Sequence, residues 1–181
     1  LFSPPDAPPP MAIQPKHPAT KSVGLRVDYG QPNFKWQMVF NAFTIERVPQ
    51  GCMVKLAYVT NNGGQISTAE IVPIVISSEG LEQTKQSAKD YIGGFADVPP
   101  YVANALPTAR QFTPLFSNHI RLSFAGHSSE IAFFTVLLTD IANATKGVLP
   151  EKTTIPCVHV ALAHSENTIH RQLVLELMKI Q

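Results

Sequence analysis

The segment Ile71-Val-Pro-Ile-Val-Ile-Ser-Ser-Glu79 decides how the fold is interpreted, because the period of the hydrophobic pattern changes within it. Up to Ile76 the residues are mostly β-branched and apolar, as in a buried strand. Beyond Ser78, which can cap a helix, apolar positions follow helical spacing, and Glu79 suits the positive end of the helix dipole. The segment predicts a strand followed by a helix over residues 78–92, which would end at Gly93-Gly94. The residues of this helix expected to face the core are Leu81, Lys85, Ala88 and Ile92.

Alternation of apolar and polar residues predicts three strands upstream of this segment. They cover residues 23–27, 36–48 and 52–60, and the first stops at Gly30-Gln-Pro32. Turn signals follow the other two, Pro49-Gln-Gly51 and Asn61-Asn-Gly-Gly64. The faces expected in the core are Trp36, Met38, Phe40 and Ala42 on one strand and Val54, Leu56 and Tyr58 on the next.

Prolines mark the limits of the regular structure. Because Pro73 cannot donate to a sheet ladder, the strand over residues 71–76 is expected at an edge or at a bulge. Residues 95–117 contain Pro99, Pro100, Pro107 and Pro114, which predict a linker with one short helical turn near residues 101–106.

A second series of elements follows the linker in the same order as the first. Strands are predicted over residues 119–125, 130–138 and 155–163, and a final helix over residues 165–180, capped by Ser165. Its expected buried stripe is Ile169, Leu173, Leu177 and Ile180.

The two series align as an internal duplication. Lys55-Leu-Ala-Tyr-Val59 matches Glu130-Ile-Ala-Phe-Phe134, and Ile76-Ser-Ser-Glu79 matches Ala163-His-Ser-Glu166. Fixed-order similarity of this kind predicts a repeated unit. The expected fold is α+β, with duplicated β-β-β-α units whose antiparallel sheets are each covered by one helix around a pseudo-two-fold axis.

The predicted organisation has four parts. An extended proline-rich arm covers residues 1–22, a first βββα unit residues 23–94, the linker residues 95–117, and a second βββα unit residues 118–181. Proline fixes φ and lacks an N–H, so we expect the arm to form polyproline II and to bind a partner. The arm residues expected to make these contacts are Leu1, Phe2, Pro8, Pro9, Pro10, Met11 and Ile13.

The second half resembles a known family. Its Phe116-Ser-Asn118 opening, its His127-Ser-Ser-Glu130 turn and its Ser165-Glu166 helix start are similar to the small bacterial family called domain of unknown function 3467, although the proline before the glutamate in that family is absent here. The stretch Ile74-Val-Ile-Ser-Ser-Glu-Gly-Leu81 is also similar to the end of a PUR repeat. The first resemblance implies no known activity, and the second implies binding of single-stranded nucleic acid.

Candidate chemical motifs are few. Gly126-His-Ser-Ser-Glu130 lacks the closing glycine and the helix of a nucleophile elbow, so we expect a hairpin turn. Cys157, His159 and His164 lack the second ligand pair of a structural zinc site. We therefore expect no catalytic residue, metal or cofactor. Asn143-Ala-Thr145 is a glycosylation sequon, which matters only in a secreted protein.

A nucleic-acid surface is the main alternative. Phe34 and Lys35, with Arg47, combine rings and positive charge as in a platform for unpaired bases. The net charge of +1 is small, yet residues 1–69 carry six Lys and Arg against three Asp and Glu.

Composition favours assembly over catalysis. Only 15% of the residues are charged against 44% hydrophobic. This composition fits a chain that covers part of its surface with a partner and equally a compact, weakly charged monomer. We expect a non-catalytic structural or interaction subunit, in a homo- or hetero-oligomer, anchored by its N-terminal arm, with a PUR-like single-stranded nucleic-acid-binding protein as the alternative. No apolar run is long enough to span a membrane. Cys52 and Cys157 are expected as reduced thiols, which favours the cytoplasm, or as one disulfide in an oxidising compartment.

Overall fold

The computed structural model describes residues 26–103, 105–106, 110–137, 139–140 and 154–181. Its contacts divide the described chain into two compact units. The smaller contains residues 26–30, 136–137, 139–140 and 154–157, and the larger contains the described residues of 31–135 together with 158–181. The N-terminal arm, residues 23–25 of the first predicted strand, and Asn143 lie outside the described residues.

The smaller unit is built around one strand pair. β1 (Arg26–Asp28) runs parallel to the first residues of β10 (Thr154–Glu166), with Val27 opposite Ile155. Val136 and Ile155 are buried, and Val27 and Cys157 pack against them. Alternating residues at the start of β10 therefore supply a small apolar cluster to this unit.

The first sheet of the larger unit contains the segment that changes period. β3 (Ala42–Val48), β4 (Gly51–Asn62) and β5 (Gln65–Ser77) are antiparallel neighbours, joined by the predicted turns at residues 49–50 and 63–64. β6 (Arg110–Gln111) and β7 (Leu115–Ser117) pair in parallel with β5. The region predicted as a linker therefore contributes two short strands, and the sheet is mixed rather than antiparallel.

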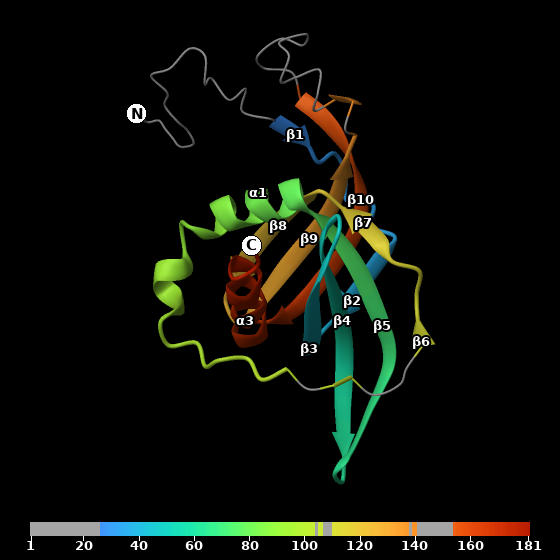
Figure 1. Ribbon diagram of the computed structural model, residues 1–181, viewed down its shortest axis with the longest axis vertical. Coiled ribbons are helices and arrows are strands. Elements are labelled where there is room, and N and C mark those ends of the chain that lie inside the picture. The colour runs from blue at the N-terminus through green and yellow to red at the C-terminus, as the bar shows by residue number, and fades with distance from the viewer. Residues whose placement is uncertain (1–25, 104, 107–109, 138, 141–153) are drawn as a thin grey trace. The chain divides into compact units, whose positions relative to one another are not determined.

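The second sheet is also mixed. β8 (His119–Ala125) and β9 (Ser128–Val136) form an antiparallel hairpin, β9 pairs with β10, and β2 (Trp36–Val39) runs parallel to β10. The strand predicted over residues 119–125 has the predicted ends, and those predicted over residues 130–138 and 155–163 are present with shifted ends. Figure 1 shows both sheets as curled rather than flat.

The long strand predicted over residues 36–48 is wrong, because it is two strands in two sheets. The Phe40 N–H donates to the carbonyl of His164 in β10 (2.9 Å), and the Asn41 N–H donates to the carbonyl of Ala57 in β4 (3.0 Å). The chain therefore passes from one sheet to the other at Phe40-Asn41. Phe40 itself is buried in the core, as its place in the pattern predicted.

Tyr58 departs from the face on which it was expected. Val54 and Leu56 are buried as predicted, but the register between β4 and β5 shifts between Ala57 and Val59. Between these two pairs β5 has two residues, Ala69 and Glu70, against Tyr58 alone in β4, so the extra residue of the bulge belongs to β5. Ala57 is buried, whereas Tyr58, the first residue of β4 beyond its last pair with β3, is 49% exposed.

Pro73 lies neither in an edge strand nor at a bulge, contrary to the prediction. It pairs with Lys55 in a regular part of the β4–β5 register. On its other side, β6 pairs with β5 at Glu70 and Ile71, and β7 pairs with it from Ile74 onward. Pro73 falls in the gap between these two short strands, where β5 needs no further donor.

The first helix is shorter than the pattern predicted. α1 (Ser78–Ala88) is capped by Ser77 rather than Ser78, since the Ser77 hydroxyl accepts the Gly80 N–H (3.0 Å). The 3₁₀ helix η2 (Ile92–Phe95) contains the two glycines that were expected as a stop. The described residues between 101 and 106 contain no helical turn.

The last helix also starts later than predicted. α3 (Asn167–Met178) has Glu166 as its N-cap, and Ser165 lies at the end of β10 with its side chain buried. Leu173 and Leu177 are buried on its stripe, whereas Ile169 and Ile180 are partly exposed.

Each helix lies close to a strand of the other predicted unit. α1 lies against β8, and α3 lies near β3 (Figure 1). A Cβ on Gly80 would meet the Asn118 backbone at 2.9 Å, so glycine permits this approach of α1 to the start of β8. Between them the sheets and helices enclose one core that includes Phe40, Phe43, Phe133 and Leu173.

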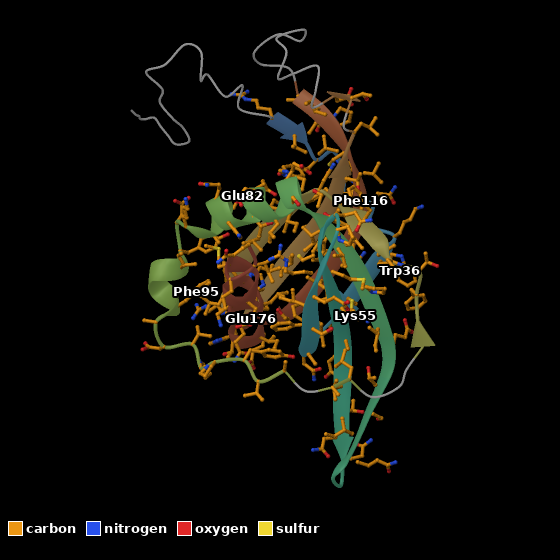
Figure 2. The ribbon with its side chains drawn as sticks, viewed as in Figure 1. Trp36, Lys55, Glu82, Phe95, Phe116 and Glu176 are labelled. Carbon is orange, nitrogen blue, oxygen red and sulfur yellow. The ribbon has the colours of Figure 1, made fainter. Side chains whose placement is uncertain are left out.

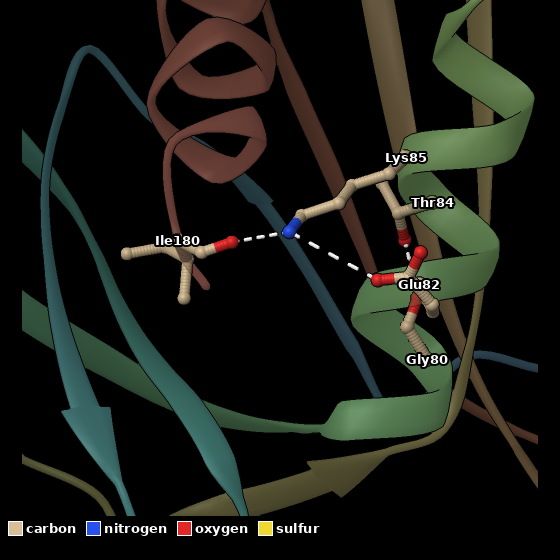
Figure 3. A network of polar contacts seen from close by, with 5 residues as sticks. All are labelled: Gly80, Glu82, Thr84, Lys85 and Ile180. Carbon is tan, nitrogen blue, oxygen red and sulfur yellow. Dashed lines mark hydrogen bonds and ion pairs between the residues drawn. The ribbon is translucent and has the colours of Figure 1, made fainter.

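Lys85 connects the two helices. Its ammonium donates to the carbonyl of Ile180, just beyond α3, and lies 4.0 Å from the carboxylate of Glu82 (Figure 3). The Lys85 side chain is 18% exposed. A cation at the C-terminal end of a helix also suits the negative pole of its dipole.

Candidate functional site

The end of the β4–β5 hairpin forms the most distinctive surface of the larger unit. Residues 58–69, called here the uncharged hairpin, have no described strand on either side of them. Figure 1 shows this end of β4 and β5 extending beyond β3 and β6. From Leu56 to Ala69 the sequence contains no Asp, Glu, Lys, Arg or His. The hairpin is therefore an exposed two-stranded extension without charge.

The loop of the uncharged hairpin is a tight two-residue turn. Gly63 and Gly64 both have positive φ, 62° and 89°, which side chains with a Cβ rarely adopt. Asn62 pairs with Gln65 across the loop, and the Asn61 side-chain oxygen accepts the Gly64 N–H (3.0 Å). The turn residues thus fix the register of the hairpin from its tip.

Asn41 fixes the base of the uncharged hairpin. Its side-chain Nδ2 donates to the carbonyl of Val59 (2.8 Å), and its Oδ1 accepts the Val59 N–H (2.7 Å). The amide therefore takes the place of a strand residue beside β4, next to the bulge at Ala57. This contact requires that the N–H and C=O groups of Val59 point away from β5.

Asn41 lines two cavities. One, of about 330 Å³, is lined by Val39, Phe40, Asn41, Tyr58, Glu166, Thr168, Ile169 and Gln172. The other, of about 320 Å³, is lined by Asn41, Ala42, Val59, Asn61, Ile66, Tyr101, Val102, Ala105 and Leu106, none of them charged. Their size suits a few apolar side chains or a small ligand.

Exposed apolar side chains gather around these cavities. Val39 (53%) and Tyr58 (49%) line the first, and Ile66 (55%) and Val102 (72%) line the second. The other large apolar side chains exposed in the described residues are Phe116, labelled in Figure 2, Leu137 and Val158. Apolar side chains that gather on one exposed surface are typical of a protein interaction site.

Tyr101 closes the edge of β3 beside the second cavity. Its hydroxyl accepts the Phe43 N–H (2.9 Å) and donates to the Phe43 carbonyl (2.8 Å), and the two rings stack at 3.9 Å. Gln83 of α1 does the same at the edge of β8. Its amide accepts the Ile120 N–H (2.9 Å) and donates to the Ile120 carbonyl (2.9 Å).

The residues predicted for nucleic-acid binding lie beside strands of two different sheets. Phe34 and Lys35 precede β2, whereas Arg47 lies in β3 of the other sheet. Phe34 is half-buried, with its ring 4.8 Å from that of His159 and 5.5 Å from that of Phe134. Lys35 and Arg47 are both exposed.

The ring cluster beside Phe34 carries positive charge at its edge. The Arg121 guanidinium lies 5.5 Å from the centre of the Phe134 ring, which is fully buried. Burial, with a contribution from Arg121, lowers the pKa of His119 to about 4. His119 is therefore neutral at physiological pH and adds no positive charge beside Arg121.

The cysteine and histidines considered as metal ligands point to different partners. The Cys157 thiol contacts the Asp28 carbonyl (3.5 Å), His159 packs in the ring cluster, and His164 lies 3.5 Å from the Glu130 carboxylate. Within the described residues, no three His, Cys, Asp or Glu side chains are grouped as metal ligands.

The other motifs considered from the sequence have structural roles in the part of the chain that the structure describes. Gly126 has φ 60° in the two-residue turn between β8 and β9, so the hairpin turn is present, and Ser128–Glu130 form the start of β9. No disulfide joins Cys52 and Cys157, and burial raises the pKa of Cys52 to about 11. The arm residues Leu1, Phe2, Pro8–Pro10, Met11 and Ile13 lie outside the described part of the chain.

Sequence reasoning missed Asn41, Tyr101 and the uncharged hairpin. A charge count along the chain would have found the hairpin, because 14 consecutive residues between Lys55 and Glu70 carry no charge in a protein with 27 Lys, Arg, Asp and Glu. No local signal marks Asn41 or Tyr101, since their roles depend on strands that meet only in the fold.

Among the described residues, no helix has the length and apolar character needed to cross a membrane. Comparison of the chain with protein-family models, with curated proteins and with solved structures found no match to any of them.

Proposed function

We propose that the protein is a non-catalytic subunit of a larger protein assembly, and that the uncharged hairpin is one of its contact surfaces. The observation that carries the proposal is an exposed two-stranded extension that lacks charge and has exposed apolar side chains at its base. Proteins usually protect such strand edges with charged residues, because exposed edges recruit other strands. An isolated two-stranded hairpin is also only marginally stable in water, which favours a partner.

The N-terminal arm is the second proposed contact surface. Ordering each residue costs roughly 1–2 kcal/mol of backbone entropy, less for proline, and the arm has only Leu1, Phe2, Met11 and Ile13 as large apolar anchors. A partner's groove surrounds a polyproline segment on several sides and recovers that cost, with Pro8–Pro10 as the rigid centre of the contact. This arm would anchor the subunit in its assembly.

Mass measurement tests the proposal most directly. The full chain, purified at native concentration, should show by light scattering a mass above the 19.8 kDa of one chain, with the ultraviolet spectrum of protein alone. A monomer at every concentration, with no co-purifying protein, would contradict an assembly subunit. A high 260 to 280 nm absorbance ratio would favour the nucleic-acid alternative.

We also propose that the larger unit arose by duplication. β3, β4, β5 and α1 recur in the same order as β8, β9, β10 and α3. β3 and β8 both contain seven residues, and β5 and β10 both contain 13. The reciprocal placement of α1 against β8 and of α3 near β3 supports a pseudo-two-fold relation. In both series a side-chain amide or hydroxyl closes the edge of the first strand.

The alternative function is a PUR-like single-stranded nucleic-acid-binding protein. Its support is the ring cluster of Phe34, His159 and Phe134, with Lys35 beside it in sequence and Arg121 at its edge. Few phosphates can be neutralised by so scattered a set of charges, so we expect any binding to be weak and salt-sensitive. Nanomolar binding of a single-stranded oligonucleotide at physiological salt would place this function first.

A further inference from the structure

One edge of the uncharged hairpin has no neighbouring strand among the described residues. β5 pairs with β4 from Gln65 onward, but its pairing with β6 begins only at Glu70. Over residues 65–69, the described part of the chain places no strand beside the outer edge of β5. By contrast, side chains cap the edges at Val59, Phe43 and Ile120.

The geometry of the hairpin determines which main-chain groups lie on that edge. In an antiparallel pair, hydrogen-bonded and non-hydrogen-bonded residue pairs alternate. The two-residue loop makes Asn62 and Gln65 a hydrogen-bonded pair. Asn61 and Ile66 are therefore a non-hydrogen-bonded pair, and so are Val59 and Thr68, in agreement with the contact of Val59 with Asn41. Ile66 and Thr68 must direct their N–H and C=O groups outward from β5.

The lack of charge favours a second copy of the same chain on this edge. When a strand pairs with itself about a two-fold axis, each charged residue near the axis meets a like charge, which is destabilising. Residues 56–69 carry no charge, so self-pairing meets no such penalty. A partner with a charged edge would gain no complementary ion pair here.

The positions of the outward groups select one register. With Ser67 on the two-fold axis, Ile66 lies opposite Thr68 of the second copy, and both outward residues form hydrogen-bonded pairs. This register makes four main-chain hydrogen bonds and sets β-branched side chains side by side. Moving the axis to Thr68 would bring Ile66 opposite Glu70, which already pairs with β6.

We propose that two copies of the chain join the outer edges of their β5 strands, antiparallel and centred on Ser67, into one continuous sheet. The inference rests on the proposed function and names a second copy as one partner of the uncharged hairpin. Ser67 of the two copies then forms a non-hydrogen-bonded pair, with Cα atoms about 4.5 Å apart.

Disulfide trapping tests the register. Ser67→Cys in a Cys157→Ser background should form a reducible covalent dimer with oxidised glutathione, because about 4.5 Å lies within the Cα range of disulfides. Gln65→Cys is the matched control on the same strand and face. Its two copies would lie about 14 Å apart along the strands and should not cross-link. Equal cross-linking of both variants, or of neither, would overturn the register.

Charge at the axis gives a second test that does not depend on oxidation. Ser67→Lys and Ser67→Glu should each weaken dimerisation about five-fold or more, because like charges meet at the axis. Mixing the two variants should restore the dimer with one copy of each, which also shows that both are folded. Light scattering gives the mass of each sample.

The outcomes separate this inference from the proposed function. If both charge variants keep the mass of the wild type, pairing at β5 is wrong, although a mass above one chain still supports an assembly subunit. If the wild type is a monomer that binds no other protein, both proposals fail. Restoration only in the mixed sample supports the β5 pairing.

Discussion

His170 is fully buried in α3, yet neither of its ring nitrogens has a hydrogen-bond partner among the described residues. Its ring packs edge-on against Phe124 at 4.4 Å, and Arg171 next to it lies 6.0 Å from the same ring. Burial first, and then the charge of Arg171, lowers the pKa of His170 to about 4. The folded protein therefore holds this imidazole neutral in an apolar environment.

This histidine makes the fold sensitive to acid. Between pH 6.5 and about 4 the unfolded chain binds a proton that folded His170 does not bind, so stability is complete above pH 6.5 and falls as the pH is lowered. The shift corresponds to at most about 3 kcal/mol for this group. His170→Leu should keep or raise the free energy of unfolding at pH 7, since it removes two unpaired nitrogens. It should also reduce the pH dependence of that free energy, and the dependence that remains includes the contribution of His119, whose pKa is lowered in the same direction. Urea unfolding from pH 4.5 to 7.5 measures this effect, with the exposed His127→Gln variant expected to behave as wild type.

Replacement of Tyr101 should change the stability of the fold through a single hydroxyl group. Tyr101→Phe keeps the ring that stacks on Phe43 but removes the hydroxyl that satisfies the Phe43 N–H and C=O. The loss should cost about 1–3 kcal/mol, because two main-chain groups in a partly buried site lose their partner. The matched control is Tyr58→Phe, whose ring is half exposed and which should change stability by less than about 0.5 kcal/mol. Equal melting temperatures for both variants would show that the hydroxyl does not protect the edge of β3.

At the scale of elements, the Lys85 side chain joins α1 to the end of α3. Lys85→Met keeps most of the aliphatic stem but removes the donor to the Ile180 carbonyl and the ion pair with Glu82 (Figure 3). We expect a loss of about 1–2 kcal/mol, since a charged donor in a mostly buried site contributes more than a surface pair. Lys179→Met is the matched control, because its side chain is 70% exposed and its ion pair with Glu176 is a surface contact. If thermal unfolding shows similar losses for both, the end of α3 is not held by Lys85.

The elements themselves were predictable where a local signal was strong. Gly63-Gly64 and Gly51 marked their turns because only glycine accepts positive φ easily, and the change of period at residues 77–78 marked the start of α1. The split of the strand at Phe40-Asn41 was not predictable, because alternation continues through it while the hydrogen-bond partner changes from β10 to β4. Likewise, Tyr58 is exposed because pairing with β3 ends at Ala57, and the sequence of β4 alone does not specify where its neighbour ends.

For the whole molecule, we predict how removal of the N-terminal arm changes stability and assembly. A chain without residues 1–22 should melt within a few degrees of the full chain, because a proline-rich segment with four large apolar residues contributes little burial to its own domain. Assembly with other subunits should be lost with the arm, whereas pairing through β5 should remain. Calorimetry and light scattering on the same sample separate the two effects. A large loss of stability in the truncated monomer would assign the arm to the core.

The uncharged edge of β5 also determines how the molecule responds to ionic strength. Salt screens interactions between charges, and an interface without charges has little for it to screen. Association through residues 65–69 should therefore stay nearly constant as sodium chloride is raised, whereas contacts with phosphates would weaken steeply. The hairpin would thus give the protein a contact that persists across changes in the ionic composition of its surroundings.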